Sequence, residues 1–124
     1  MRIVKEIEIE GKKARVLFDT GSFHTYVTRR LLDGIHIRQV PVPYKVAIGG
    51  EAIEVKESCI IVGRIEGYGF DTKATPINEL GEVDGKVLDA IIGAETMEGW
   101  EIKLDPRNDT LDLDGLKRRE FTEY

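Results

Sequence analysis

One short stretch constrains the fold more than any other: an apolar strand that runs directly into a polar turn. Residues 13–18 have the β-forming pattern of a pleated, half-buried strand, and Asp19-Thr20-Gly21-Ser22 follows at once. Gly21 allows the backbone to turn sharply while Asp19 stays at the strand end. The sequence therefore predicts that the chain presents a carboxylate at the end of a strand.

The turn alone would also fit an ordinary connection, because Asp, Ser and Gly are common turn residues. Two later segments make it more informative. Gly49-Gly50 separates two β-rich runs, residues 44–48 and 52–55, and predicts a hairpin. Ile91-Ile92-Gly93 ends an apolar run and leads into a helix-forming segment. Each is unremarkable by itself, but the three in this order indicate a site.

These residues resemble a known family. Leu17-Phe18-Asp19-Thr20-Gly21-Ser22 resembles the active-site loop of the aspartic proteases, and in so short a chain it resembles the single-lobed, retropepsin-like branch. Residues 90–97, followed by 100–105 and 110–113, are similar in order and spacing to the closing segment of that family. The predicted hairpin takes the place of the family's flap. The resemblance extends from about residue 12 to residue 113.

The resemblance implies an all-β fold, an acid-protease-like closed barrel lobe with one short helix near its C-terminal end, in a single domain over residues 1–124. It also implies roles. Thr20 would bond across a dimer axis, and Ser22 would hold the carboxylate of its own Asp19. The implied site comprises the catalytic Asp19, Thr20 and Gly21, the substrate-binding and flap residues Ser22, Ile48, Gly49 and Gly50, and Ile91, Ile92 and Gly93 supporting the loop.

If the resemblance holds, the length of the chain implies that two copies must assemble. Aspartic protease chemistry needs two carboxylates, and the 124 residues contain one Asp-Thr-Gly. We therefore expect a homodimer in which Asp19 meets its copy across a two-fold axis. Two such carboxylates share one proton, so that one acts as base toward water and the other as acid toward a peptide carbonyl. This chemistry needs no cofactor and no metal.

Two departures from the family pattern are visible. Glu95 stands where members often have Asp, which still suits a helix N-terminus. Retroviral members interleave both chain ends in a shared sheet, whereas residues 117–124 are charged and show no strand pattern. The mode of pairing therefore stays open at the level of sequence.

The remaining pattern is that of short strands. In the first part of the chain, we expect a hairpin over residues 2–18, β structure over 23–28 and a helical turn at 29–32 whose two arginines are solvated. Strands are expected over 54–65 and 68–77, followed by a loop over 78–86. The last part should contain a strand buried on both faces over 87–92, a helix over 93–100 and a turn at 105–109. An extended connection is expected at Pro41-Val42-Pro43.

The composition of the chain limits the kinds of partner that we expect it to bind. A charged fraction of 33% and a net charge of -5 give no reason to expect nucleic acid. No stretch is long and apolar enough to span a bilayer, and we expect a cytoplasmic protein without membrane contact. Cys59 cannot form an internal disulfide and is expected to be buried. The two histidines show no metal-ligand spacing, and His24 beside Ser22 does not resemble a nucleophile elbow.

Three functions are compatible with the sequence. The first is a homodimeric aspartic endopeptidase that cleaves extended or unfolded polypeptide. The second is a non-catalytic module of the same fold that binds peptides or assembles partners. The third is a β-rich domain of unrelated function. The intact Asp19, Thr20 and Gly21 favour the endopeptidase.

Overall fold

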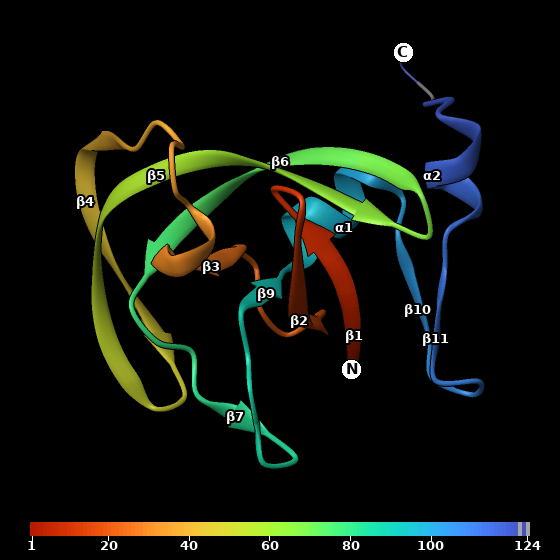
Figure 1. Ribbon diagram of the computed structural model, residues 1–124, viewed down its shortest axis with the longest axis horizontal. Helices are drawn as coiled ribbons and strands as arrows, with labels where there is room; N and C mark the ends of the chain where they lie inside the picture. The colour runs from red at the N-terminus through yellow and green to blue at the C-terminus, as the bar shows by residue number, and fades with distance from the viewer. Residues whose placement is uncertain (122, 124) are drawn as a thin grey trace.

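A computed structural model describes residues 1–121 and 123 of the chain. Its strands are β1 (Arg2–Ile9), β2 (Lys12–Asp19), β3 (Tyr26–Thr28), β4 (Arg38–Ile48), β5 (Glu51–Ile65), β6 (Tyr68–Ile77), β7 (Glu82–Val83), β8 (Lys86–Val87), β9 (Ala90–Ile92), β10 (Lys103–Asp105) and β11 (Thr110–Asp112) (Figure 1). Its short helical segments are η1 (Arg29–Leu31), α1 (Ala94–Trp100) and α2 (Asp114–Arg118). The predicted all-β class is confirmed.

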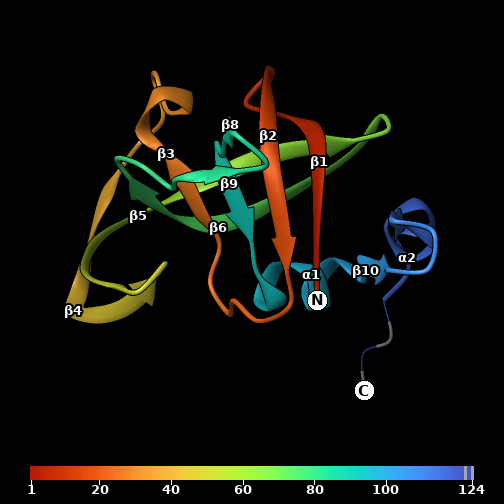
Figure 2. The same ribbon diagram turned by 90° about the horizontal axis from the view of Figure 1, so that it is seen from below.

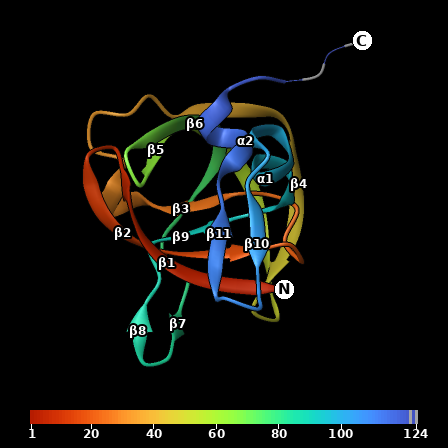
Figure 3. The same cartoon turned by 90° about the vertical axis from the view of Figure 1, so that its right-hand side faces the viewer.

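The main sheet closes on itself. Its seven strands follow the order β1-β2-β9-β3-β6-β5-β4, and β1 also pairs with β5 through Glu8 opposite Arg64 and Ile9 opposite Gly63. All of these strands except β4 therefore form a ring, and Figure 3 shows the β10–β11 hairpin in front of it. The β1–β2 turn adds to the closure of the ring between β1 and β5. Glu10 N–H donates to Val62 O at 2.9 Å, and the Glu10 carboxylate accepts from Val62 N–H at 2.6 Å.

Two apolar clusters stabilise the ring, and β2 contributes to both. The larger contains Val16, Phe18 and Ile92, each 0% exposed. Leu17 points the other way and packs with Tyr26 and its neighbours in a second cluster. Because successive side chains of a strand point to opposite faces, this end of β2 is buried on both sides. The position of Asp19, the last residue of β2, is fixed accordingly.

The local turn predictions agree with the structure. The β1–β2 hairpin, the β4–β5 hairpin around Gly49-Gly50, the β5–β6 turn and the helix after Gly93 all form where expected. Gly49 and Gly50 have φ of +56° and +84°, as a two-residue hairpin turn with positive φ at both positions requires. The helical turn predicted at residues 29–32 is η1. Part of the predicted tail, residues 122 and 124, lies outside the described residues.

Three predictions need correction. The apolar run 87–92 is a strand only over β9: Val87 is 61% exposed in β8, and Asp89 is buried. The predicted loop 78–86 contains a small β7–β8 hairpin. Residues 23–28 form a strand only from Tyr26 onward. In addition, the charged tail begins with a helix, α2, that the sequence pattern did not indicate.

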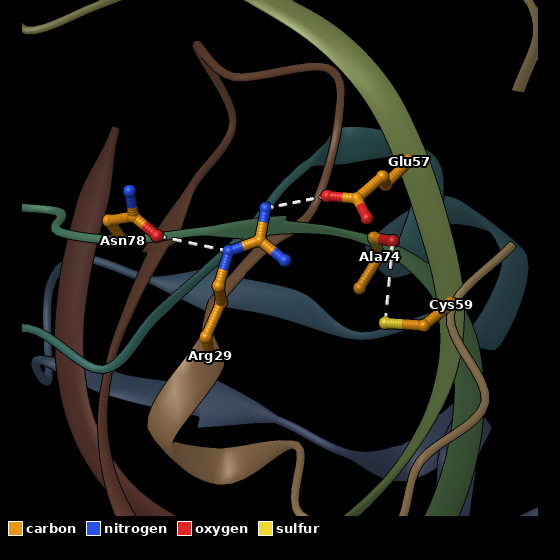
Figure 4. Close-up of polar contacts among 5 residues, drawn as sticks. All are labelled: Arg29, Glu57, Cys59, Ala74 and Asn78. Atoms are coloured by element: carbon orange, nitrogen blue, oxygen red, sulfur yellow. Dashed lines mark hydrogen bonds and ion pairs between the residues drawn. The ribbon is translucent and has the colours of Figure 1, made fainter. Parts of the chain in front are cut away.

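The two arginines of η1 are on the surface as expected, but both have partners. Arg29 donates to Glu57 Oε1 at 2.6 Å and to Asn78 Oδ1 at 3.0 Å, which joins η1 to β5 and to the end of β6 (Figure 4). Arg30 pairs with the buried Asp89. No helix of the described residues has the length and apolar character needed to cross a membrane.

Cys59 lies in the core beside these contacts, and its Sγ is 3.7 Å from Ala74 O (Figure 4). Burial raises the pKa of the Cys59 thiol above its ordinary value of 9.0; the Glu10 carboxylate adds to the rise and the Arg29 guanidinium opposes it. The folded chain therefore keeps the thiol proton to higher pH than the unfolded chain does.

We predict that the thiol destabilises the fold at alkaline pH. Its contribution to stability is fully present below the unfolded pKa of 9.0 and is lost as the pH rises through the folded pKa. Urea unfolding at several pH values should show a smaller loss of unfolding free energy above about pH 9 for Cys59→Ala than for wild type. Equal losses in the two proteins would contradict this.

Candidate active site

The Asp19 carboxylate is oriented by its own turn. Gly21 N–H donates to Asp19 Oδ1 at 2.8 Å, and Ser22 N–H donates to Asp19 O at 3.1 Å. The first bond places the carboxylate against the backbone of the loop and leaves Oδ2 without a protein donor among the described residues. A carboxylate held in this way can accept or deliver a proton at its outer oxygen.

The resemblance implied roles for two hydroxyl residues of the turn, and the structure tests one of them. Ser22 Oγ donates to His24 O at 3.0 Å, so the expectation that Ser22 holds the Asp19 carboxylate is wrong in this structure. The same bond shows that Ser22 makes no nucleophile pair with the His24 ring. Thr20 is exposed, and its hydroxyl donates to Met1 O at 3.3 Å. A bond from Thr20 across a dimer axis stays a prediction.

The loop rests on the N-terminus of α1. Ala94 N–H donates to Ser22 O at 2.7 Å, and Glu95 N–H donates to Phe23 O at 3.0 Å. A Cβ on Gly93 would lie 2.2 Å from His24 O, so only glycine permits this approach of the two backbones. The structure therefore places Gly93 directly against the loop.

The strand before Gly93 lies beside the strand before Asp19. In the parallel β2–β9 pair, Leu17 is opposite Ile91 and Phe18 is opposite Ile92. Ile92 is in the main core, whereas Ile91 faces the second cluster and a cavity. Ile91, Ile92 and Gly93 thus support the loop from one side, as a strand and a helix entry.

Three threonine hydroxyls connect this arrangement to the rest of the sheet. Thr25 Oγ1 accepts from Gly93 N–H at 3.1 Å and is 2.6 Å from Thr96 Oγ1, which is 2.7 Å from Thr72 Oγ1. The chain of hydroxyls joins the segment after the loop, α1 and β6. Sequence reasoning missed these residues, because they lie in three different elements: Thr25 just before β3, Thr72 in β6 and Thr96 in α1.

The Asp19 loop borders a cavity of about 510 Å³. Of the predicted site residues, Asp19, Gly21, Ser22, Ile48, Gly49 and Ile91 line it. Thr20, Gly50, Ile92 and Gly93 are not among its lining. The lining residues that sequence reasoning missed are Arg2, Leu17, Ala47, Leu80, Gly81, Glu82, Val83 and Leu88.

Two hairpins flank this cavity. The tip of the β4–β5 hairpin contributes Ala47, Ile48 and Gly49, and the β7–β8 hairpin contributes Glu82 and Val83. In Figure 1 both hairpins extend to the lower side of the ring. The β4–β5 hairpin, hereafter the flap, thus lies where a cover for a bound ligand would be needed.

An aromatic group connects the Asp19 loop to the flap. The His24 ring centroid is 5.5 Å from that of Tyr44 on β4 and 6.4 Å from that of Tyr26 on β3. Burial raises the pKa of the Tyr26 hydroxyl, and the neighbouring Tyr44 adds to the rise. Tyr26 packs in one apolar cluster with Leu17 and Ile91, which line the cavity.

The charges around the cavity are Asp19, Glu82 and Arg2. Arg2 lies opposite Asp19 in the β1–β2 pair. Within residues 1–121 and 123, no group of three or more His, Cys, Asp or Glu side chains could hold a metal ion.

No family model matches the sequence, and no curated protein matches it. Solved structures do. The retroviral protease-like domain of Ddi1 from Leishmania major overlays with a TM-score of 0.64 at 14% identity, over 92% of this chain and 89% of that domain. EIAV protease, in complex with the inhibitor HBY-793, overlays with a TM-score of 0.61 at 16% identity, over 85% of this chain and 93% of that one.

We predict that the Thr25 hydroxyl stabilises the loop support. Thr25→Val leaves Gly93 N–H buried without an acceptor and should lower the unfolding free energy by about 1–3 kcal/mol, whereas Thr25→Ser should recover most of the loss. Urea unfolding of both variants tests this. Equal destabilisation by valine and serine would show that the methyl group matters and the hydroxyl does not.

Proposed function

The chain has a retropepsin-like fold, and we propose on this basis that it is an aspartic endopeptidase that acts as a homodimer on extended or unfolded polypeptide. One observation carries the proposal. Asp19, followed by Thr20 and Gly21, borders a cavity beside a glycine-tipped flap. The fold alone would not suffice, since one fold hosts many functions.

The proposed dimer rests on the number of Asp-Thr-Gly turns, because Glu82, the other carboxylate in the cavity lining, belongs to the β7–β8 hairpin and not to such a turn. One chain brings one Asp-Thr-Gly turn to the cavity, and acid–base activation of water requires two carboxyl groups in different protonation states. In a two-fold dimer, each subunit supplies Asp19. The pair shares one proton because two adjacent carboxylates cannot both ionise without strong repulsion.

The proposed reaction then has two proton movements. The ionised carboxylate takes a proton from a water molecule as the water oxygen attacks the peptide carbonyl carbon. The protonated carboxyl group donates its proton to the carbonyl oxygen. Collapse of the resulting tetrahedral species breaks the C–N bond, and the leaving amine takes up a proton.

The lining of the cavity suits an extended substrate. Its lining is apolar at Leu17, Ile48, Leu80, Leu88 and Ile91, which suits apolar side chains of the peptide. An extended peptide between the flap and the loop would bond through its backbone and point alternate side chains into such pockets. The glycines at the flap tip allow the backbone changes that a cover needs in order to open and close.

We predict that cleavage depends on Asp19. Asp19→Asn keeps the side-chain oxygen that accepts from Gly21 N–H but removes the acid–base function, so the cleavage rate should fall about 10²–10⁴-fold. The assay is digestion of a denatured protein from about pH 3 to pH 8, with the dimer fraction recorded in each sample.

Asp33→Asn is the matched control, because Asp33 is an exposed carboxylate whose only ion pair among the described residues is a 3.9 Å contact with Lys12. It should cleave like wild type. Equal cleavage by wild type and Asp19→Asn would mean that a contaminant is responsible. A folded dimer without cleavage at any pH would favour a non-catalytic peptide-binding module.

A further inference from the structure

A second cavity adjoins the cavity at Asp19. It has a volume of about 330 Å³, and Leu80, Gly81, Glu82 and Leu88 line both cavities. Its other walls come from the end of β3, from η1, from the residues after β6 and from β8: Thr28, Arg30, Asn78, Glu79 and Val87. Figure 2 shows β8, seen from below, between β3 and β2. A ligand bound at Asp19 therefore has a second cavity next to it for one of its side chains.

The β7–β8 hairpin turns one of its faces toward the second cavity. In this pair, Glu82 is opposite Val87, and Val83 is opposite Lys86. Residues directly opposite each other in an antiparallel pair share a face, and Glu82 and Val87 both line the second cavity. Val87 is 61% exposed, so its side chain offers apolar surface that a ligand would remove from water.

The second cavity carries an excess of negative charge. Glu79 and Glu82 line it, and neither forms an ion pair within residues 1–121 and 123. The only other charged lining residue is Arg30, which is paired with the buried carboxylate of Asp89. The positive charge of Arg30 is thus already balanced, whereas the charges of the two glutamates are not.

This combination of walls fits a long cationic side chain. Leu80, Val87 and Leu88 can contact a hydrocarbon stem, and the glutamate carboxylates can accept hydrogen bonds from an ammonium or guanidinium group. Lysine and arginine have both parts. An acidic side chain would face like charges, and a short apolar side chain would leave the carboxylates without a partner.

We propose that the second cavity selects polypeptides with a lysine or an arginine at one fixed position relative to the bond held at Asp19, and that Glu82 determines this preference. The inference rests on the proposed function, because it names the substrates of that site. Glu82 lines both cavities, whereas Glu79 lines only the second and has a supporting role. The expected substrate is an extended segment in which one basic residue accompanies apolar neighbours.

Mapping of fragment ends tests the preference during cleavage. Wild type would digest a denatured protein, and mass spectrometry should find Lys or Arg enriched at one position relative to the cleaved bond. Glu82→Lys reverses the charge of the wall, so this variant should lose the enrichment and favour Asp or Glu at the same position.

Asp84→Asn is the matched control for this experiment. Asp84 is an exposed carboxylate at the tip of the same hairpin and lines neither cavity. Asparagine tolerates its positive φ of 54°. This variant should therefore give the same fragment ends as wild type.

Peptide binding tests the preference without cleavage. Labelled peptides of extended, apolar sequence would carry either lysine or norleucine at one position, and the set would move that position along the peptide. Norleucine keeps the hydrocarbon stem of lysine and lacks its charge. At one position, Asp19→Asn should bind the lysine peptide about two- to fivefold more tightly in fluorescence anisotropy. The ratio should approach one when Glu82→Gln is added, and also at about 1 M salt, which screens the charges.

The two experiments separate this inference from the proposed function. Binding that prefers lysine through Glu82, without cleavage by wild type at any pH, would support the inference and contradict the endopeptidase. Cleavage without a basic preference, or with a preference that Glu82→Lys leaves unchanged, would support the endopeptidase and overturn the inference. Neither binding nor cleavage of any peptide would overturn both.

Discussion

The close approach of two backbones at Gly93 is the constraint on which the site depends. The first N–H groups of α1 have no side-chain cap, and carbonyls of the residues that follow Asp19 accept from them instead. Helix donors and loop carbonyls therefore satisfy each other, as buried backbone groups must. A side chain at Gly93 would separate them and release the loop. The position of the Asp19 carboxylate is thus a consequence of where a helix of seven residues begins.

The same arrangement leaves the Asp19 loop open to a partner. The end of β2 is buried on both faces, which places Asp19 at the edge of the packed structure with its loop exposed at Thr20. For the proposed reaction, the flap and the β7–β8 hairpin would provide walls for a peptide. The Asp-Thr-Gly turn of one chain supplies one of the two carboxylates that the proposed reaction uses, so the proposed function and the proposed dimer depend on each other.

Much of the fold could be read from the sequence because its signals are local. Glycine-containing turns between alternating strands predicted the hairpins, and the Asp-Thr-Gly turn predicted where the carboxylate lies. What could not be predicted depends on the folded arrangement.

The partner of a short hydroxyl is one example. Ser22 was expected to contact Asp19 but bonds to His24 O, and Thr25 contacts Thr96, which is 71 positions away in the sequence. The apolar run 87–92 was read as one strand, because periodicity cannot show that the chain leaves the sheet at a hairpin. Arg2 reaches the cavity through the β1–β2 pair, and Glu82 through the position of the β7–β8 hairpin, which the sequence pattern did not predict.

The activity of mixed dimers distinguishes a pair of Asp19 carboxylates shared by two subunits from a site within one chain. Wild type and Asp19→Asn would be mixed in varying ratios, allowed to exchange subunits, and assayed for cleavage of a denatured protein. If each subunit supplies one carboxylate, only dimers of two wild-type chains cleave, and an equal mixture retains about one quarter of the activity of the undiluted wild type. Activity that falls only in proportion to the wild-type fraction, to about one half, would show that each chain acts alone and would contradict the shared pair.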